Sequence, residues 1–368
     1  MIHHVSSHPL ACRASFTKTR VRNDGQFHDR NDTNISSRAN GDTETGVAQI
    51  ASELGVPYIL STASSSTIEE VAEANGDGSN RWYQLYWPQD DEITISLLQR
   101  AQKANFKVLV VTLDTWALSW RPWDLDAAYV PFMKGIGDAI GFSDPVFQRK
   151  FKEKYGHEWK DDIHNAALEW QSDVFSGRAH TWDQLELLKK NWDGPIVLKG
   201  IQHVEDAKKA AECGVQGIIV SNHGGRQMDG AIGSLEMLPE IVDAVGDKIE
   251  VLFDSGVRTG VDIIKALCLG AKGVLIGRPW CYGLGIAGKA GAKAAMQGIL
   301  AVSGICPERF VHTKANCLRR ISIARWDWRA WQLSRTATGA CCVGSSTQET
   351  RTRLTRDALS WKMPRCER

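Results

Sequence analysis

Residues 221–230, with the sequence SNHGGRQMDG, place a histidine and an arginine three positions apart among glycines. An imidazole can act as a general base near neutral pH, and a guanidinium can bind an anion in a two-pronged geometry. Glycines let the backbone approach a bound molecule closely. A single histidine in a polar turn is more often structural than catalytic, but the whole decapeptide favours a catalytic loop with His223 as base and Arg226 as anion ligand.

The decapeptide directly follows the apolar run 217–220, which is typical of a buried strand. A second apolar run, residues 195–198, ends in Lys199. A lysine at a strand end can form a Schiff base, bind a phosphate or place a positive charge beside a cofactor ring. The residues alone leave these roles open, and a salt bridge at the rim of the sheet is the structural alternative.

Two further strand ends carry glycines followed by arginines. Residues 254–260 (DSGVRTG) include Asp254, Gly256 and Arg258, and residues 276–279 (IGRP) include Gly277 and Arg278. Backbone N–H groups at glycines and helix N-termini bind anions, and (β/α)8 barrels often hold a phosphate after their last two strands. The two segments together predict a phosphate site, to which the arginines add charge-assisted hydrogen bonds.

Residues 283–288 (GLGIAG) match the G-x-G-x-x-G pattern of dinucleotide-binding folds. They come several residues after their strand, and no βαβ unit with a ribose-binding acid follows them. We therefore expect a loop and a helix start here, and no NAD site.

From residue 44 to about residue 298, short apolar runs alternate with amphipathic stretches. This pattern indicates an α/β fold with a parallel sheet, either a TIM (β/α)8 barrel or an open doubly wound sheet. We favour the barrel, because functional-looking residues end every recognisable strand instead of clustering at one switch point. Residues 1–43 contain no apolar run, so the first strand is expected to be missing or replaced. The long connection over residues 115–180 predicts a lid or a substrate-binding insertion.

The composition argues against several classes of protein. A net charge of +1 without a polybasic block argues against nucleic-acid and membrane-surface binding. No apolar stretch reaches the roughly 18 residues of a membrane span, and nine cysteines without metal-ligand spacing predict no metal site. No secretory or peroxisomal signal is recognisable, which favours a cytoplasmic protein. Residues 1–43 and 301–368 are expected to be irregular ends that flank a barrel over residues 44–300.

Together, these segments resemble the FMN-dependent α-hydroxy-acid oxidizing enzymes. The resemblance covers about residues 44–298, and residues 114–126 (DTWALSWRPWDLD) with the long insertion are most similar to lactate 2-monooxygenase. It implies a (β/α)8 barrel with FMN as cofactor. It also implies oxidation of a lactate-like L-2-hydroxy acid to a 2-oxo acid or its decarboxylated product, with oxygen as acceptor.

The resemblance also gives roles to residues at the strand ends. His223 would be the catalytic base, Asp114 would orient it, and Tyr86, Arg121 and Arg226 would bind the substrate. The residues that would contact FMN are Ser61, Gln84, Thr112, Lys199, Ser221, Asp254, Gly256, Arg258, Gly277 and Arg278.

Two alternatives stay open at this point. One is another phosphate-binding barrel enzyme, such as a flavin-dependent isomerase. The other is a truncated, inactive or flavin-deficient remnant of the family, because its first strand is expected to be lost. The residues do not decide which 2-hydroxy acid is the substrate, or whether the chain forms a homo-oligomer.

Overall fold

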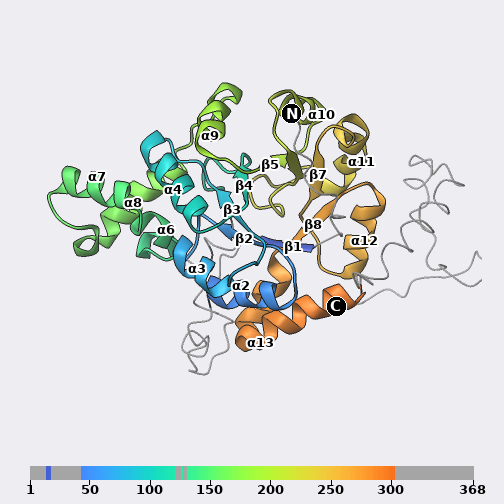
Figure 1. The fold of residues 1–368 in the computed structure, drawn as a ribbon, viewed down its shortest axis with the longest axis horizontal. Coiled ribbons are helices and arrows are strands. Elements are labelled where there is room, and N and C mark those ends of the chain that lie inside the picture. The colour runs from blue at the N-terminus through green and yellow to red at the C-terminus, as the bar shows by residue number, and fades with distance from the viewer. Residues whose placement is uncertain (1–13, 18–42, 122–125, 127–130, 303–368) are drawn as a thin grey trace, which may run out of the picture. The chain divides into compact units, whose positions relative to one another are not determined.

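A computed structural model describes residues 14–17, 43–121, 126 and 131–302. Its eight parallel strands close into a barrel in chain order (Figure 1). The strands are β1 (Ala14–Thr17), β2 (Tyr58–Ser61), β3 (Arg81–Leu85), β4 (Val108–Thr112), β5 (Ile196–Ile201), β6 (Gly217–Val220), β7 (Glu250–Phe253) and β8 (Gly273–Ile276). The predicted (β/α)8 barrel is confirmed.

The sequence predicts that the first strand is missing or replaced, and in the structure a four-residue strand, β1, takes its place. β1 pairs with β2 through Phe16 and Tyr58, and with β8 through Ser15 and Leu275, so it joins the two ends of the sheet. Strand pairing uses main-chain N–H and C=O groups, which four ordinary residues supply without an apolar run. Residues 1–13, 18–42 and 303–368, which include the rest of the two expected irregular ends, lie outside the described residues.

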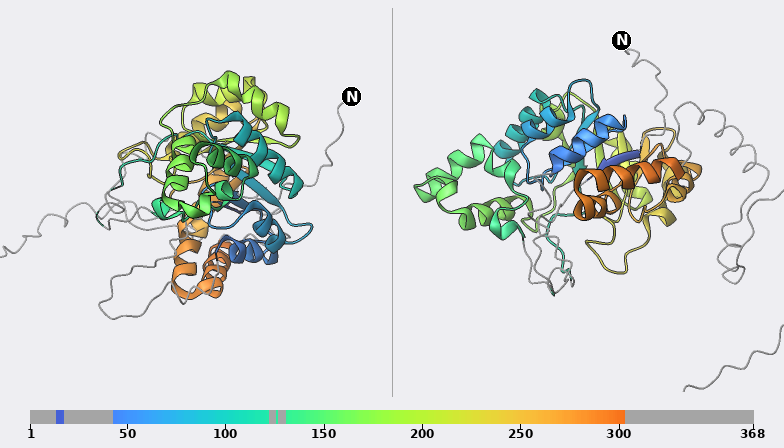
Figure 2. Two further views of the ribbon diagram at one scale, coloured as in Figure 1. Left: turned by 90° about the vertical axis from the view of Figure 1, so that its left-hand side faces the viewer. Right: turned by 90° about the horizontal axis from the view of Figure 1, so that it is seen from below.

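A helix follows each strand and packs outside the barrel, as three views show (Figures 1 and 2). These helices are α2 (Glu44–Glu53), α3 (Ile68–Asn75), α4 (Asp91–Lys103), α9 (Leu185–Asn191), α10 (Val204–Glu212), α11 (Ser234–Val245), α12 (Gly260–Cys268) and α13 (Arg278–Val302). Lys289 and Lys293 of α13 bond to Gln49 and Glu53 of α2, which ties the last helix to the first one described.

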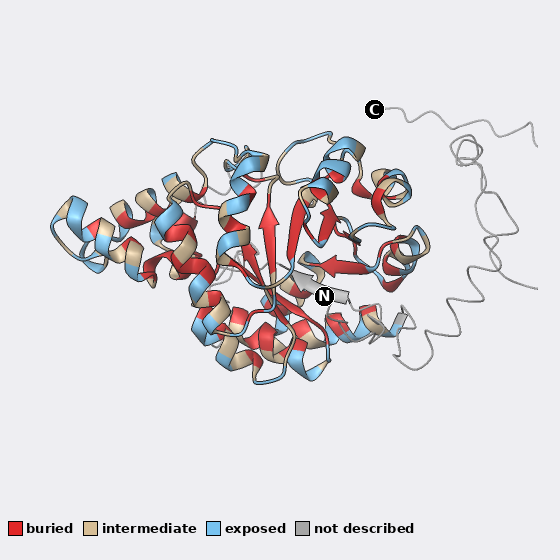
Figure 3. Ribbon diagram, turned by 45° about the horizontal axis from the view of Figure 1, so that its top comes forward, coloured by how far each residue is buried: buried red, intermediate tan, exposed pale blue. Residues whose placement is uncertain are grey.

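The residues of strands β2 to β8 are mostly buried (Figure 3). Because side chains alternate along a strand, one set points into the barrel and the other packs against the helices. The inward set forms a small apolar cluster: Ile59, Val110, Val197, Ile219, Leu252 and Leu275. The next inward position on each of these strands lies two residues further on. Those positions hold Ser61, Thr112, Lys199, Ser221, Asp254 and Gly277.

The long connection between β4 and α9 contains several short helices, which project to one side of the barrel (Figures 1 and 2). They are η1 (Pro131–Lys134), α6 (Ala139–Phe142), α7 (Pro145–Tyr155), η2 (Trp159–Asp161), α8 (Ile163–Val174) and η3 (Trp182–Gln184). The buried carboxylate of Asp144 accepts hydrogen bonds from Ser96 (2.7 Å) and Arg100 (3.2 Å) of α4. These bonds fix the insertion to the barrel.

The GLGIAG segment is expected to be a loop and a helix start, and in the structure only its last two residues leave the helical conformation. It lies within α13, whose backbone departs from helical geometry at Ala287 and Gly288. A Cβ at Gly283 would meet the carbonyl oxygen of Gly291 at 2.4 Å, so the glycines allow the two halves of α13 to cross closely. Among the described residues, no helix is long and apolar enough to cross a membrane.

Candidate active site

His223 and Asp114 meet at the carboxyl end of the barrel, on the loops after β6 and β4. His223 Nδ1 lies 2.6 Å from Asp114 Oδ1 and 2.8 Å from Thr115 Oγ1. Because an ionised carboxylate only accepts hydrogen bonds, Nδ1 carries the proton and Nε2 is left as the basic nitrogen. Nε2 lies 3.5 Å from the hydroxyl of Tyr86. This geometry suits a general base that lies beside a phenol.

The backbone of His223 is left-handed, with φ of 58°. The side chain is nearly buried, with 8% of the residue exposed. A non-glycine residue rarely adopts this conformation, and such strain is concentrated at functional sites.

Lys199 lies between two carboxylates inside the barrel. Its Nζ is 3.4 Å from Asp114 Oδ2 and 3.4 Å from Asp254 Oδ2, and it donates to Ser221 Oγ at 2.9 Å. Burial alone would lower the pKa of Lys199, but the charges of Asp114 and Asp254 outweigh burial and raise it. Lys199 is therefore a fixed positive charge, and it connects the residues predicted for catalysis with those predicted for the cofactor.

Three more predicted residues form a chain of hydrogen bonds across neighbouring strands. Ser61 Oγ donates to Gln84 Oε1 at 2.8 Å, and Gln84 Nε2 donates to Thr112 Oγ1 at 2.8 Å. All three side chains are buried. The strand register places Ser61 opposite Gln84 and Thr112 opposite Lys199, so the sheet itself brings these polar groups to one level.

The two arginines predicted to bind substrate are joined through the backbone of the loop after β6. Arg121 Nε lies 3.3 Å from the carbonyl oxygen of Arg226, and Arg121 Nη2 donates to Gln227 Oε1 at 3.2 Å. Ser119 Oγ also donates to the Arg226 carbonyl. Arg121 thus holds the loop that carries His223 and Arg226, while the two-pronged binding of a carboxylate stays a prediction.

The ends of β7 and β8 are open and cationic. Arg258 and Arg278 are both exposed, and Arg278 Nη2 donates to the carbonyl oxygen of Gly224 at 2.7 Å. Gly256 has φ of 72°, and a Cβ built on it would meet no heavy atom within 4 Å. Gly277 begins the turn into α13. Open space beside a glycine turn with two guanidinium groups suits a phosphate.

The donor set fits FMN. Buried hydroxyl, amide and ammonium groups line the barrel mouth, where they could bond the edge of a flavin ring, and the exposed guanidinium groups could bind its phosphate. Asp254 lies between these two regions, 3.4 Å from Lys199, where a carboxylate could bond a polyol chain. The arrangement therefore provides donors for each part of the cofactor.

Two residues near His223 were missed by the sequence reasoning. Thr115 Oγ1 contacts both His223 and Asp114, at 2.8 and 3.0 Å. Ser255 Oγ accepts hydrogen bonds from the loop that carries His223. Each lies next to a predicted residue, but adjacency in sequence does not show which way a hydroxyl points. The insertion also reaches the site, because Phe175 packs edge-on against Tyr86 with ring centroids 4.9 Å apart.

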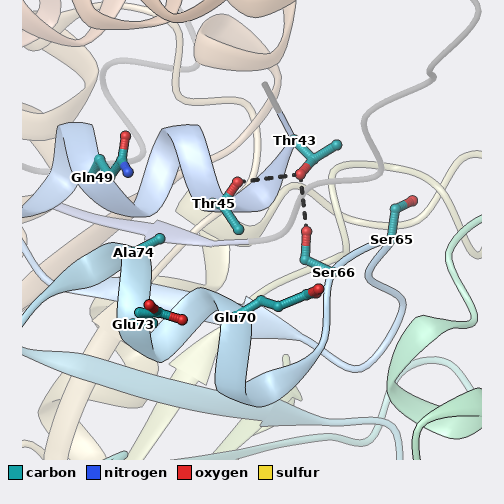
Figure 4. Close-up of a pocket in the computed structure, with 8 residues that line it drawn as sticks. All are labelled: Thr43, Thr45, Gln49, Ser65, Ser66, Glu70, Glu73 and Ala74. Carbon is teal, nitrogen blue, oxygen red and sulfur yellow. Dashed lines mark hydrogen bonds between the residues drawn. The ribbon is translucent and has the colours of Figure 1, made fainter. Parts of the chain in front are cut away.

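A cavity of about 660 Å³ lies away from these residues, between α2, α3 and the loop that precedes α3 (Figure 4). Hydroxyl groups and the carboxylates of Glu70 and Glu73 line it, and its described lining has no cationic side chain. It therefore does not suit a phosphate or a substrate carboxylate. The strand ends, not this cavity, carry the residues predicted for chemistry.

Comparisons with known proteins agree with this geometry. A sequence profile described as FMN-dependent dehydrogenase matches residues 33–301. An FMN-dependent alpha-hydroxy acid dehydrogenase of Penicillium citrinum is 61% identical over 286 residues, which cover 76% of this chain and 70% of the relative. An L-lactate oxidase of Lysinibacillus sphaericus is 42% identical over 256 residues, covering 70% and 64%. A crystal structure of mandelate oxidase, 35% identical, matches with a TM-score of 0.57 over 70% of this chain and 67% of that one. The chain thus spans about two thirds of the length of these proteins.

Proposed function

Because the chain belongs to the FMN-dependent dehydrogenase family, whose members here include α-hydroxy-acid dehydrogenases and oxidases, we propose that it binds FMN and oxidises an L-2-hydroxy acid to the 2-oxo acid. The observation that carries the proposal is the His223–Asp114 pair, 2.6 Å apart, beside the buried charge of Lys199. An open, cationic pair of strand ends next to this group supports a phosphorylated cofactor. The relatives named oxidases support a reaction with oxygen.

Oxidation of a 2-hydroxy acid to a 2-oxo acid removes two electrons and two protons, one proton from the α-carbon and one from its hydroxyl oxygen. His223 Nε2 would take a proton there, because Nδ1 is engaged by Asp114 and Thr115. Asp114 then stabilises the imidazolium that forms. FMN, when bound, supplies the acceptor for the two electrons.

The substrate carboxylate needs a cationic partner close to the base. Arg226 lies three residues after His223, and Arg121 lies against the same loop. We assign the carboxylate to these two arginines and the substrate hydroxyl to the neighbourhood of Tyr86 and His223. Lysine cannot reproduce the forked geometry of arginine, so the assignment can be tested by replacements that keep the charge.

We assign the flavin ring edge to Ser61, Gln84, Thr112 and Lys199, and the chain that bears the phosphate to the loop residues of the last three strands. The latter are Ser221, Asp254, Gly256, Arg258, Gly277 and Arg278. With oxygen as acceptor, each turnover would release one 2-oxo acid and one hydrogen peroxide. If both stayed in the site, they would react further to the shortened acid, carbon dioxide and water, which is the lactate 2-monooxygenase outcome.

The alternative of an inactive remnant depended on a missing first strand. The pairing of β1 with β2 and β8 closes the barrel, which supports an active enzyme over that alternative. The similarity to α-hydroxy-acid oxidoreductases disfavours a flavin-dependent isomerase.

The test is to load the full chain with FMN and offer L- and D-2-hydroxy acids that differ in side chain, from lactate to mandelate. We expect a 2-oxo acid or its shortened acid from the L-enantiomers. Arg226→Lys should lower kcat/KM by about 10-fold or more. Arg149→Lys is the matched control, because Arg149 pairs with Glu92 and Glu153 on the surface. Formation of no oxidised product from any 2-hydroxy acid would contradict the proposal.

A further inference from the structure

Two neighbouring loops at the site hold non-glycine residues in the left-handed region. Among the described residues, the non-glycine residues with positive φ are Asn105 (62°), His223 (58°) and Ser255 (89°). His223 follows β6 and Ser255 follows β7, and these strands pair directly. A serine at φ of 89° is disfavoured where a glycine would fit without strain. Its side chain must therefore provide something that glycine cannot.

The hydroxyl of Ser255 holds the backbone on both sides of His223. Ser255 Oγ accepts from the N–H of Asn222 at 3.2 Å and from the N–H of Gly224 at 2.9 Å. It donates its own proton to Asp254 Oδ1 at 2.8 Å. One donor and two acceptor positions are the full capacity of a hydroxyl group, so Ser255 uses all of it here.

The amide of His223 itself is held by a second serine, because it donates to Ser221 Oγ at 3.0 Å. Three consecutive N–H groups thus point at serine hydroxyls, and this pattern fixes the left-handed turn. The turn aims the imidazole at Asp114 and Tyr86. Without the Ser255 bonds, residues 222 and 224 lose the acceptor that keeps them in this arrangement.

The far end of the same loop is held independently. Arg121 and Ser119 bond to the carbonyl oxygen of Arg226, and these residues belong to the β4 loop. Ser255 therefore acts on the His223 end of the loop and leaves the Arg226 end in place. A change at Ser255 should therefore slow catalysis and leave binding of the substrate carboxylate nearly unchanged.

We propose that Ser255 is a positioning residue that holds His223 in its left-handed, base-competent conformation through the amides of Asn222 and Gly224. The expected effect of Ser255 on flavin reduction rests on the proposed function, whereas its expected effect on the conformation of the loop does not. The hydrogen bonds of the Ser255 hydroxyl offset the conformational strain of two left-handed residues, Ser255 and His223.

The test uses full-length, FMN-loaded Ser255→Gly and Ser255→Ala. Ser255→Gly removes the hydroxyl and relieves the local strain, whereas Ser255→Ala removes the hydroxyl and keeps the strain. Asn105→Gly is the matched control, because Asn105 is exposed, also has a positive φ, and lies in the turn between α4 and β4. Three quantities are measured: anaerobic flavin reduction by an L-2-hydroxy acid, the Kd of pyruvate, and hydrogen exchange at the Gly224 amide.

Both Ser255 variants should reduce flavin about 10- to 100-fold more slowly, because a displacement of about 1 Å in a catalytic group can have that effect. The Kd of pyruvate should change by less than about 2-fold, and the Gly224 amide should exchange at least about 10-fold faster. Asn105→Gly should match the wild type in all three.

Unchanged flavin reduction in Ser255→Ala would overturn the proposal, as would unchanged exchange at Gly224. Failure of both variants to fold or to bind FMN would also overturn it, since Ser255 would then be a residue of the fold. If the wild-type chain oxidises no 2-hydroxy acid, the proposed function fails, while the exchange measurement still decides whether Ser255 holds the loop.

Discussion

Replacement of Lys199 by methionine should destabilise the protein strongly, even though methionine suits a buried position. The side chain of Lys199 is 3% exposed, and its ammonium group neutralises Asp114 and Asp254 at 3.4 Å each. Lys199→Met removes the ammonium group that lies between these two carboxylates. Removal of one partner of a buried ion pair costs about 3–5 kcal/mol. For a domain of this size about 1 kcal/mol shifts Tm by roughly 2–4 °C, so we expect Tm to fall by about 10 °C.

The loss of stability in Lys199→Met should be constant between about pH 6 and pH 9. The pKa of Lys199 is raised above its usual value of 10.5, because the two carboxylates outweigh the effect of burial. A raised lysine pKa contributes stability that is fully present below the unfolded-state pKa and is lost only as the pH rises through the higher folded-state pKa. The contribution is therefore complete across the neutral range.

Thermal unfolding of the FMN-free chain, followed by circular dichroism, measures this effect without a contribution from ligand binding. Lys208→Met is the matched control, because Lys208 pairs with Glu205 on an exposed helix face, and it should change stability by less than about 0.5 kcal/mol. Adding Asp254→Asn to Lys199→Met should restore part of the loss, since one of the two carboxylate charges beside residue 199 is removed. A Lys199→Met variant within about 1 kcal/mol of wild type would refute the reasoning.

Two further predictions concern a glycine contact and a titrating carboxyl group. Gly200→Ala should slow turnover at least about 10-fold, because the added Cβ would lie 2.7 Å from Asp114 Cβ and push that carboxylate away from His223. Gly214→Ala is the control, because Gly214 shares the positive φ of Gly200 but its added Cβ would meet no atom within 4 Å. This variant should be near normal in steady-state kinetics. Burial raises the pKa of Asp173 to about 6 from 3.8, so the folded state loses stability as the pH rises from about 4 to 6. Asp173→Asn should abolish that slope and be more stable than wild type by about 1–3 kcal/mol at pH 8, as measured by urea unfolding; an unchanged slope would contradict the assignment.

The level at which the polar residues of the strands meet was predictable, because successive side chains of a strand point to opposite faces. Apolar inward residues such as Ile59, Val110 and Val197 are followed two positions later by Ser61, Thr112 and Lys199. The alternation brings the polar residues to the mouth of the barrel, where a parallel barrel gathers its chemistry. A strand with an apolar core and a polar end is therefore sufficient to predict the level at which these side chains meet.

Features that depend on the main chain could not be read in this way. β1 has no apolar run and is held by backbone pairing, so its four residues look like a polar linker. The role of Ser255 depends on a φ of 89° and on the direction of a hydroxyl, neither of which residue type reveals. The same holds for Arg121: its charge predicts an anion ligand, but residue type does not reveal that its Nε and Nη2 also bond to the loop after β6.

The central claim is that His223 is the base for oxidation of a 2-hydroxy acid. The most direct measurement mixes the FMN-loaded chain with an L-2-hydroxy acid in the absence of oxygen and follows the loss of flavin absorbance, for wild type and for His223→Gln. The account predicts rapid bleaching in the wild type, with FMN binding retained but bleaching about 10²–10⁴-fold slower in His223→Gln. Bleaching at equal rates in the two proteins would contradict it.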